Sequence, residues 1–111
     1  MPKTNMASRD HNYIARLQNA IRQLHHCESK YIESVTVSGT LLFFQKSTVE
    51  EVEVAVFEIS DNPQAKRAYA WSCRDGNYMR CVVVLEIPPV SSPQTAFDAA
   101  VAAQIVNRTL R

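Results

Sequence analysis

The sequence predicts an α+β fold: a two-layer sandwich in which a three- or four-stranded antiparallel sheet carries the N- and C-terminal helices on one face. Three observations lead to this class. Apolar residues recur at helical spacing near the two ends of the chain. Between the ends lie stretches rich in β-branched and aromatic residues. A single Asp-Gly pair, Asp75-Gly76, separates the last two stretches and indicates a tight hairpin turn.

Length and charge limit the class of protein. At 111 residues the chain can build one domain around one core, which we expect over residues 10–111 behind a flexible tail at residues 1–9. Twelve basic and eleven acidic residues give a net charge of +1, so no overall charge attracts nucleic acid or anionic lipid. The chain has neither an apolar leader segment nor a run of about eighteen apolar residues. We therefore expect a soluble, cytoplasmic protein without a membrane partner.

The first helix is expected from Asp10, a good capping residue, to about His26. Its apolar positions form one stripe, made of Tyr13, Ile14, Leu17, Ile21 and Leu24. A strand follows over residues 31–37 and is interrupted by Ser38-Gly39. The sequence leaves open whether residues 41–44 extend this strand past a bulge or form a separate piece.

The boundaries of the later elements are clearer. A strand is predicted over residues 50–59, followed by a turn at residues 60–63, where Ser, Asp, Asn and Pro are typical turn residues. The C-terminal helix begins after Ser92, a natural cap, with Pro93 at the first helical position, where no N–H is needed. Its apolar stripe consists of Phe97, Ala100, Val101, Ile105 and Val106. Its further alanines, Ala96, Ala99, Ala102 and Ala103, allow close approach to a neighbouring element.

The hairpin separates its side chains onto two distinct faces. If Asp75-Gly76 is the whole turn, Trp71 lies opposite Arg80 and Tyr69 lies opposite Val82. One face then carries Ala68, Ala70, Met79, Cys81, Val83, Leu85 and Ile87. The other face carries Arg67, Tyr69, Trp71, Tyr78 and Arg80, with Val82 and Val84 between them. With both helices on the first face, the second is left uncovered, and we interpret it as an interface or ligand face. In the alternative, a β-bulge shifts the register and places the aromatic residues in the core.

An open aromatic face without net positive charge favours a protein interface. We expect self-association as a homodimer through this face or through a sheet edge, with Arg67 and Arg80 reaching Glu51 or Glu53. The alternative is a single-stranded nucleic acid, whose bases would stack on the aromatic rings and whose phosphates would meet Arg67, Arg74 and Arg80. The glutamates expected on the same face oppose phosphate binding.

No residue cluster indicates catalysis, a metal or a cofactor, so we expect a non-enzymatic binding or accessory module. The four residues from His25 to Glu28 are consecutive, so their side chains fan out and cannot converge on one ion. The cysteines, Cys27, Cys73 and Cys81, lack metal or redox spacing and are expected as free thiols. With two glycines, the chain has no glycine-rich phosphate loop.

Three segments carry a resemblance to known proteins: HCESKYIESV at residues 26–35, KRAYAWS at residues 66–72 and VLEIPPV at residues 84–90. Together they resemble a family of small bacterial proteins of unknown function, which implies no activity. Separately, the order helix, strands, helix resembles the double-stranded RNA-binding domain. The lysine cluster that opens that family's last helix is replaced here by SPQT at residues 92–95, and residues 45–48 lack the family's Gly-Pro-x-His loop. We therefore expect no tight binding to duplex RNA or DNA at physiological salt.

Overall fold

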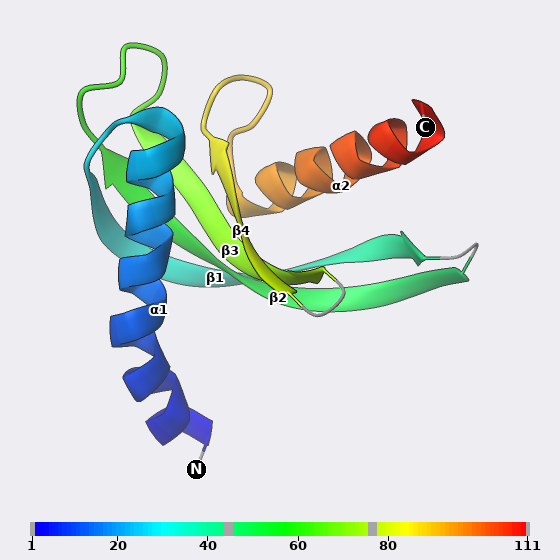
Figure 1. Ribbon diagram of the computed structural model, residues 1–111, viewed down its shortest axis with the longest axis horizontal. Coiled ribbons are helices and arrows are strands. Elements are labelled where there is room, and N and C mark those ends of the chain that lie inside the picture. Colours follow the sequence, from blue (N-terminus) through cyan, green and yellow to red (C-terminus); the bar gives the residue numbers. More distant parts are fainter. Residues whose placement is uncertain (1, 44–45, 76–77, 111) are drawn as a thin grey trace.

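The computed structural model describes residues 2–43, 46–75 and 78–110, and the side chains of residues 12–39, 51–72 and 80–103. Its elements follow in the order α1 (Pro2–His25), β1 (Ser29–Phe43), β2 (Lys46–Ile59), β3 (Arg67–Asp75), β4 (Tyr78–Leu85) and α2 (Pro93–Leu110). The four strands form one antiparallel sheet in the order β1-β2-β3-β4 (Figure 1). The predicted α+β class, with a helix at each end of the chain, is confirmed.

Helix α1 is longer than the sequence suggested. It begins at Pro2 and not at Asp10, so residues 2–9, expected as a flexible tail, are helical. Its C-terminal end lies close to the predicted position. His26 adopts a positive φ of 58° and donates its N–H to the Arg22 carbonyl oxygen at 2.9 Å, the bond of a left-handed helix cap. The Arg22 guanidinium also binds both oxygens of the Glu28 carboxylate, at 3.1 and 3.0 Å, and so spans the turn into β1.

Strand β1 contains a bulge, although not at the predicted place. The strand runs through Gly39 without a register shift and continues to Phe43, so residues 41–43 extend it; Phe44 lies outside the described residues. The pairing with β2 shifts instead between Tyr31 and Glu33. This bulge places Tyr31 on the same face as Phe57, with ring centroids 5.8 Å apart, while Val35 faces the opposite side. The imperfect alternation of apolar residues in this strand follows from the bulge.

The two hairpins diverge from a short shared centre. Strand β2 pairs with β3 only from Ala55–Ala70 to Glu58–Arg67. Beyond this point β1 and β2 continue as a long two-stranded arm, which extends away from β3 and β4 in Figure 1. The Ser72 N–H, next along β3, instead donates to the Tyr13 hydroxyl of α1 at 2.9 Å. Helix α1 thus provides a hydrogen-bond acceptor for a backbone N–H of β3 that lies beyond the paired part of β2.

The β3–β4 hairpin has the predicted faces but a different pairing. Asp75 pairs with Tyr78, and Trp71 pairs with Val82 where the sequence suggested Arg80. The pairing is shifted by two positions, and an even shift keeps every side chain on its predicted face. Asp75 therefore belongs to the strand and is not part of a two-residue Asp-Gly turn. The two residues between the strands, Gly76 and Asn77, lie outside the described residues.

The prediction that both helices pack on one face is wrong. Two apolar clusters lie on opposite faces of the sheet, and Figure 1 shows α1 and α2 on opposite sides of the strands. In the first cluster, Leu17 and Ile21 of α1 pack over residues that include Ala55, Phe57, Ala68 and Ala70. In the second, Ala96 and Phe97 of α2 pack over residues that include Val54, Val56, Tyr69 and Trp71. The alternative of a bulge that reverses the hairpin faces does not occur; the aromatic face is covered by α2.

Helix α2 is capped as predicted and is fixed to β1. Ser92 Oγ accepts the Thr95 N–H at 3.2 Å, and Thr95 Oγ1 accepts the Ser92 N–H at 2.9 Å. Two backbone N–H groups at the start of the helix thus find hydrogen-bond acceptors. Gln94 then donates to the Ser38 carbonyl oxygen at 2.8 Å. The helix lies so close to β1 that a Cβ atom at Gly39 would be 2.6 Å from the Phe97 ring. Glycine is needed here for space.

Candidate functional site

The predicted aromatic face is not an open surface in this fold. Tyr69 and Trp71 are 1% and 3% exposed. The Trp71 ring lies against the Phe97 ring of α2, with centroids 5.7 Å apart and planes inclined by 53°. Arg67 and Arg80 are exposed, whereas the side chain of Tyr78 is outside the described part of the structure. The five predicted residues therefore share one face without forming one accessible patch.

The hydroxyl of Tyr69 is a polar group within the apolar second cluster. It donates to the Glu86 carboxylate at 2.5 Å. Burial raises the pKa of Tyr69 to about 12, and the hydrogen bond and negative charge of Glu86 act in the same direction, while the charge of Arg67 acts against them. Charges of alternating sign cross the end of the sheet here, because Lys30 pairs with Glu58 and Glu58 pairs with Arg67.

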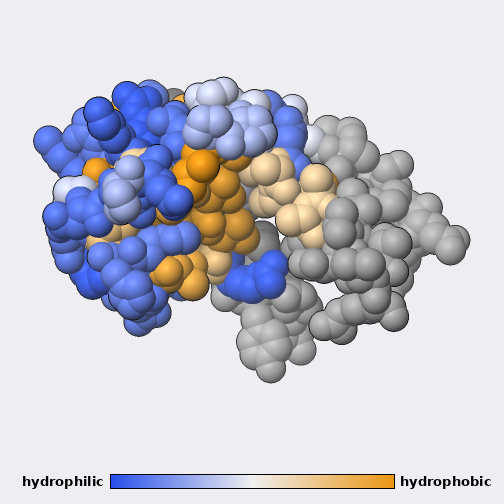
Figure 2. Space-filling view, turned by 90° about the horizontal axis from the view of Figure 1, so that it is seen from above, coloured by the Kyte–Doolittle hydropathy of each residue, from blue (hydrophilic) through white to orange (hydrophobic). Residues whose placement is uncertain are grey.

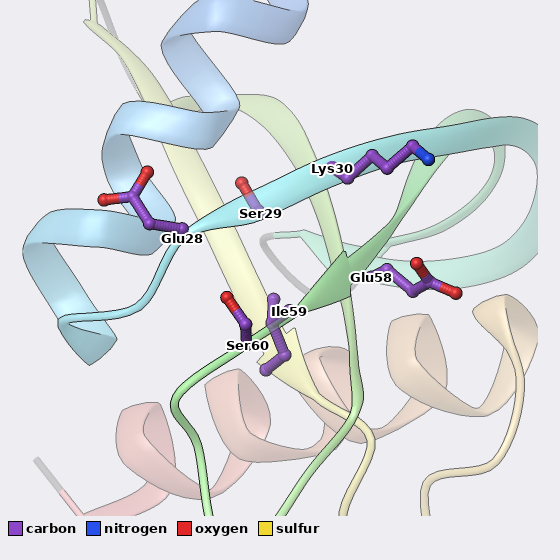
Figure 3. Close-up of a pocket in the computed structure, with 6 residues that line it drawn as sticks. All are labelled: Glu28, Ser29, Lys30, Glu58, Ile59 and Ser60. Atoms are coloured by element: carbon purple, nitrogen blue, oxygen red, sulfur yellow. The ribbon is translucent and has the colours of Figure 1, made fainter.

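A shallow, open hollow lies where β1 begins and β2 ends (Figure 3). It measures about 290 Å³ and is lined by Glu28, Ser29, Lys30, Glu58, Ile59 and Ser60. In Figure 3 the charged groups point apart, with Glu28 on one side and Lys30 and Glu58 on the other. The Glu28 carboxylate is already bound by Arg22. The hollow thus lacks the convergent polar groups of a ligand site.

The remaining reactive groups in the part of the chain that the structure describes are the cysteine thiols and the side chains that could bind a metal ion. Cys27 and Cys81 are free thiols, and burial raises the pKa of Cys27, which makes it a weaker nucleophile. The side chain of Cys73 is outside the described residues. No three His, Cys, Asp or Glu residues with described side chains are close enough to hold a metal ion. Among the described helices, neither is long and apolar enough to cross a membrane.

The two outer strands of the sheet differ in how they treat their open edges. Strand β1 carries a bulge and a series of exposed polar residues, Lys30, Glu33, Thr36 and Ser38. Bulges and charges are the usual means by which an edge strand avoids pairing with another chain. Strand β4 has no register shift against β3, and its segment from Cys81 to Leu85 reads Cys-Val-Val-Val-Leu without a charge. We call this segment the β4 edge.

Backbone groups of the β4 edge point outward. The Glu86 N–H donates to the Arg67 carbonyl oxygen at 2.9 Å, which identifies the residues that bond to β3. Because bonding alternates along an antiparallel pair, Val82 and Val84 bond to β3, whereas Cys81 and Val83 direct their N–H and C=O groups away from it. In the described chain no strand lies beyond β4. The outward groups form a template for another strand.

The side chains of the β4 edge are apolar on both faces. Cys81, Val83 and Leu85 adjoin the cluster under α1, while Val82 and Val84 adjoin the cluster under α2, and all five are only partly buried. A strand that is apolar on both faces is typical of an interior position in a sheet. Beyond it, Ile87 is 37% exposed. The space-filling view in Figure 2 shows an apolar patch open to solvent beside a largely hydrophilic surface.

The aromatic face was predicted from the sequence as an interface, whereas the β4 edge was not. The signal was present, because five uncharged apolar residues in a row are unusual for a strand with an open edge. Comparison with protein-family models, with curated proteins and with solved structures finds no match for this chain. The resemblance to a bacterial family therefore remains a prediction, and the four strands depart from the three of the double-stranded RNA-binding order.

Proposed function

We propose that this protein is a small non-enzymatic binding or accessory module that acts as a homodimer, joined through the β4 edges of two copies. The observation that carries the proposal is the uncharged, doubly apolar segment from Cys81 to Leu85 on an open edge. Pairing would bury its side chains further on both faces and satisfy its outward backbone groups. It would join the two four-stranded sheets into one.

A second copy is the partner that fits this edge best. Two identical antiparallel strands related by a twofold axis present the same groups to each other, so the edge is complementary to itself. Over residues 29–39, where the side chains of β1 are described, its edge offers no equivalent, because Lys30 and Glu33 are exposed there and the bulge interrupts the ladder. Single-stranded nucleic acid has less support, since bases cannot stack on Tyr69 and Trp71 while α2 covers these rings.

Sedimentation of the wild type over a wide range of concentrations tests the proposal, together with a Val83→Pro variant. Proline at this position removes only the N–H that points outward, and edge strands tolerate proline when the missing N–H faces solvent. We expect a wild-type dimer and a folded, monomeric Val83→Pro variant.

Two matched variants serve as controls for this experiment. Val82→Pro removes an N–H that bonds to β3, so it should reduce the helical circular dichroism signal and the melting temperature. Thr36→Lys adds a charge to the β1 edge and should leave the dimer unchanged. A wild type that stays monomeric at high concentration would overturn the proposal, as would a Val83→Pro variant that dimerises like the wild type.

A further inference from the structure

Opposite charges stand at the two ends of the β4 edge. Arg80 precedes the uncharged segment and Glu86 follows it. Both residues lie on the face covered by α2. Arg80 pairs with Cys73, which is two residues beyond Trp71 and so on the same face, and the Glu86 carboxylate accepts a hydrogen bond from the Tyr69 hydroxyl. The bond from Tyr69 holds the Glu86 carboxylate in place beside the strand, and Arg80 is exposed.

We propose that the two β4 edges pair in the register centred on Val83, so that Arg80 of each copy lies opposite the partner's Glu86. The inference rests on the proposed homodimer and specifies how its two copies recognise each other. In an antiparallel pair centred on Val83, positions equally far from it on either side face each other. Cys81 then lies opposite the partner's Leu85, and the charged residues form two equivalent ion pairs.

The backbone geometry suits this register. Cys81, Val83 and Leu85 direct their N–H and C=O groups outward, so they would form the hydrogen-bonded positions of the new ladder. Arg80 and Glu86 would occupy positions without hydrogen bonds, where facing side chains are closest. The Leu85 carbonyl oxygen already accepts the Ile87 N–H at 2.8 Å and keeps a second lone pair for a partner.

Neighbouring registers bring no opposite charges together. A pair centred on Val82 places Arg80 opposite the partner's Val84 and Glu86 opposite the partner's Tyr78. A pair centred on Val84 places Glu86 opposite the partner's Val82. Registers of this kind set each charge against an uncharged side chain of the partner, so no ion pair forms across the interface. The charges therefore select one alignment of an edge whose valines alone would accept several.

Charge exchange between two variants tests the pairing. Arg80→Glu places two glutamates opposite each other at both ends of the interface, and Glu86→Arg does the same with arginines. We expect each single variant to raise the Kd of the homodimer roughly ten- to a hundredfold, because two facing pairs change from opposite to like charge. An equimolar mixture of the two variants restores opposite charges in both pairs, so it should form a heterodimer with a Kd near that of the wild type.

A disulfide test does not depend on the altered charges. In a chain with Cys73→Ser and Cys81→Ser, the Val83→Cys substitution should form a disulfide across the twofold axis, since facing residues at a hydrogen-bonded position have Cα atoms about 5.5 Å apart. Val82→Cys in the same chain is the control. It would link two copies only in the register centred on Val82, so we expect far less of its disulfide dimer under mild oxidation.

The outcomes separate this inference from the proposed function. A monomeric wild type would overturn both. A dimeric wild type whose Val83→Pro variant is monomeric supports the β4 edge. If in that case the variant mixture shows no heterodimer preference and Val82→Cys links better than Val83→Cys, the register is wrong and the edge proposal stands. Glu86→Arg also removes the partner of Tyr69, so its circular dichroism and melting curve are compared with the wild type; if it does not fold, the disulfide pair decides.

Discussion

The two faces of strand β3 carry side chains of opposite size. Toward α1 this strand contributes the small residues Ala68 and Ala70, beside the larger Phe57 of β2, and the helix contributes Leu17 and Ile21. All five are fully buried. Small residues on the strands let a helix with long side chains lie close to the sheet.

Under α2 the sizes are reversed. Here β3 contributes the aromatic rings of Tyr69 and Trp71, and the helix contributes Ala96 at 0% exposure beside one large residue, Phe97. Gly39 on β1 leaves the space that the Phe97 ring occupies. Each helix therefore matches one face in volume, so exchanging the two helices between the faces would leave voids on one side and overlaps on the other.

The prediction with the largest expected effect tests whether the aromatic face under α2 is part of the folded core. Trp71→Ala should lower the free energy of unfolding by about 3–5 kcal/mol, because it opens a cavity beside Phe97. Thermal melts at low and high protein concentration should show the same loss. Leu24→Ala, at a residue that is 58% exposed, is the control and should change stability by about 0.5 kcal/mol or less.

A different result would restore the interface reading of Trp71. In that case Trp71→Ala would leave the melting curve of the monomer unchanged and weaken the dimer instead. Iodide quenching of the single tryptophan gives an independent reading. We expect weak quenching in the wild type at every concentration, since the ring is 3% exposed within one chain.

The second prediction tests the requirement for small residues under α1. Ala70→Leu adds volume where the wild-type residue is fully buried, so we expect a loss of about 1–3 kcal/mol from overpacking. Ala99→Leu makes the same chemical change at an exposed position of α2 and should stay within about 0.5 kcal/mol of the wild type. Urea denaturation measures both. Equal effects in the two variants would show that the α1 face has room to spare.

Side chains alternate between the two faces of a strand, and this alternation explains why the two faces of the hairpin could be predicted while the exact pairing of its strands could not. The segment Asp75-Gly76-Asn77 contains two overlapping turn dipeptides, Asp-Gly and Gly-Asn, and both are typical of tight hairpins. Moving the turn by one residue moves the pairing by two. Face assignment is unaffected by an even shift, so Tyr69 and Trp71 share a face in either case.

The side on which each helix packs was not predictable from periodicity. An apolar stripe shows that a helix is covered along one side, but both sheet faces are apolar and either could receive it. Residue size carried the missing information, since the alanine-rich α2 matches the aromatic face and the Leu- and Ile-bearing α1 matches the alanines. The β4 edge is a tertiary feature in the same sense, because the outward backbone groups of Val83 can meet a partner only if no further strand covers them, and in the described chain none lies beyond β4.

The smallest effect concerns the one hydroxyl that the α2 face buries. Tyr69→Phe removes the hydrogen bond to Glu86 and keeps the ring, so we expect the free energy of unfolding to fall by about 1 kcal/mol at neutral pH.

The direction of the pH dependence follows from the pKa of Tyr69. Tyr69 has a pKa of about 12 in the folded chain against 10.0 for the ordinary side chain, so the unfolded state loses its proton first as the pH rises. Unfolding then releases a proton, and the stability from this group, complete below pH 10, is lost between pH 10 and about 12. Denaturation of both proteins across this range should show the wild-type advantage shrinking as the pH rises, and an advantage that stays constant would show that the folded chain does not hold this proton more tightly.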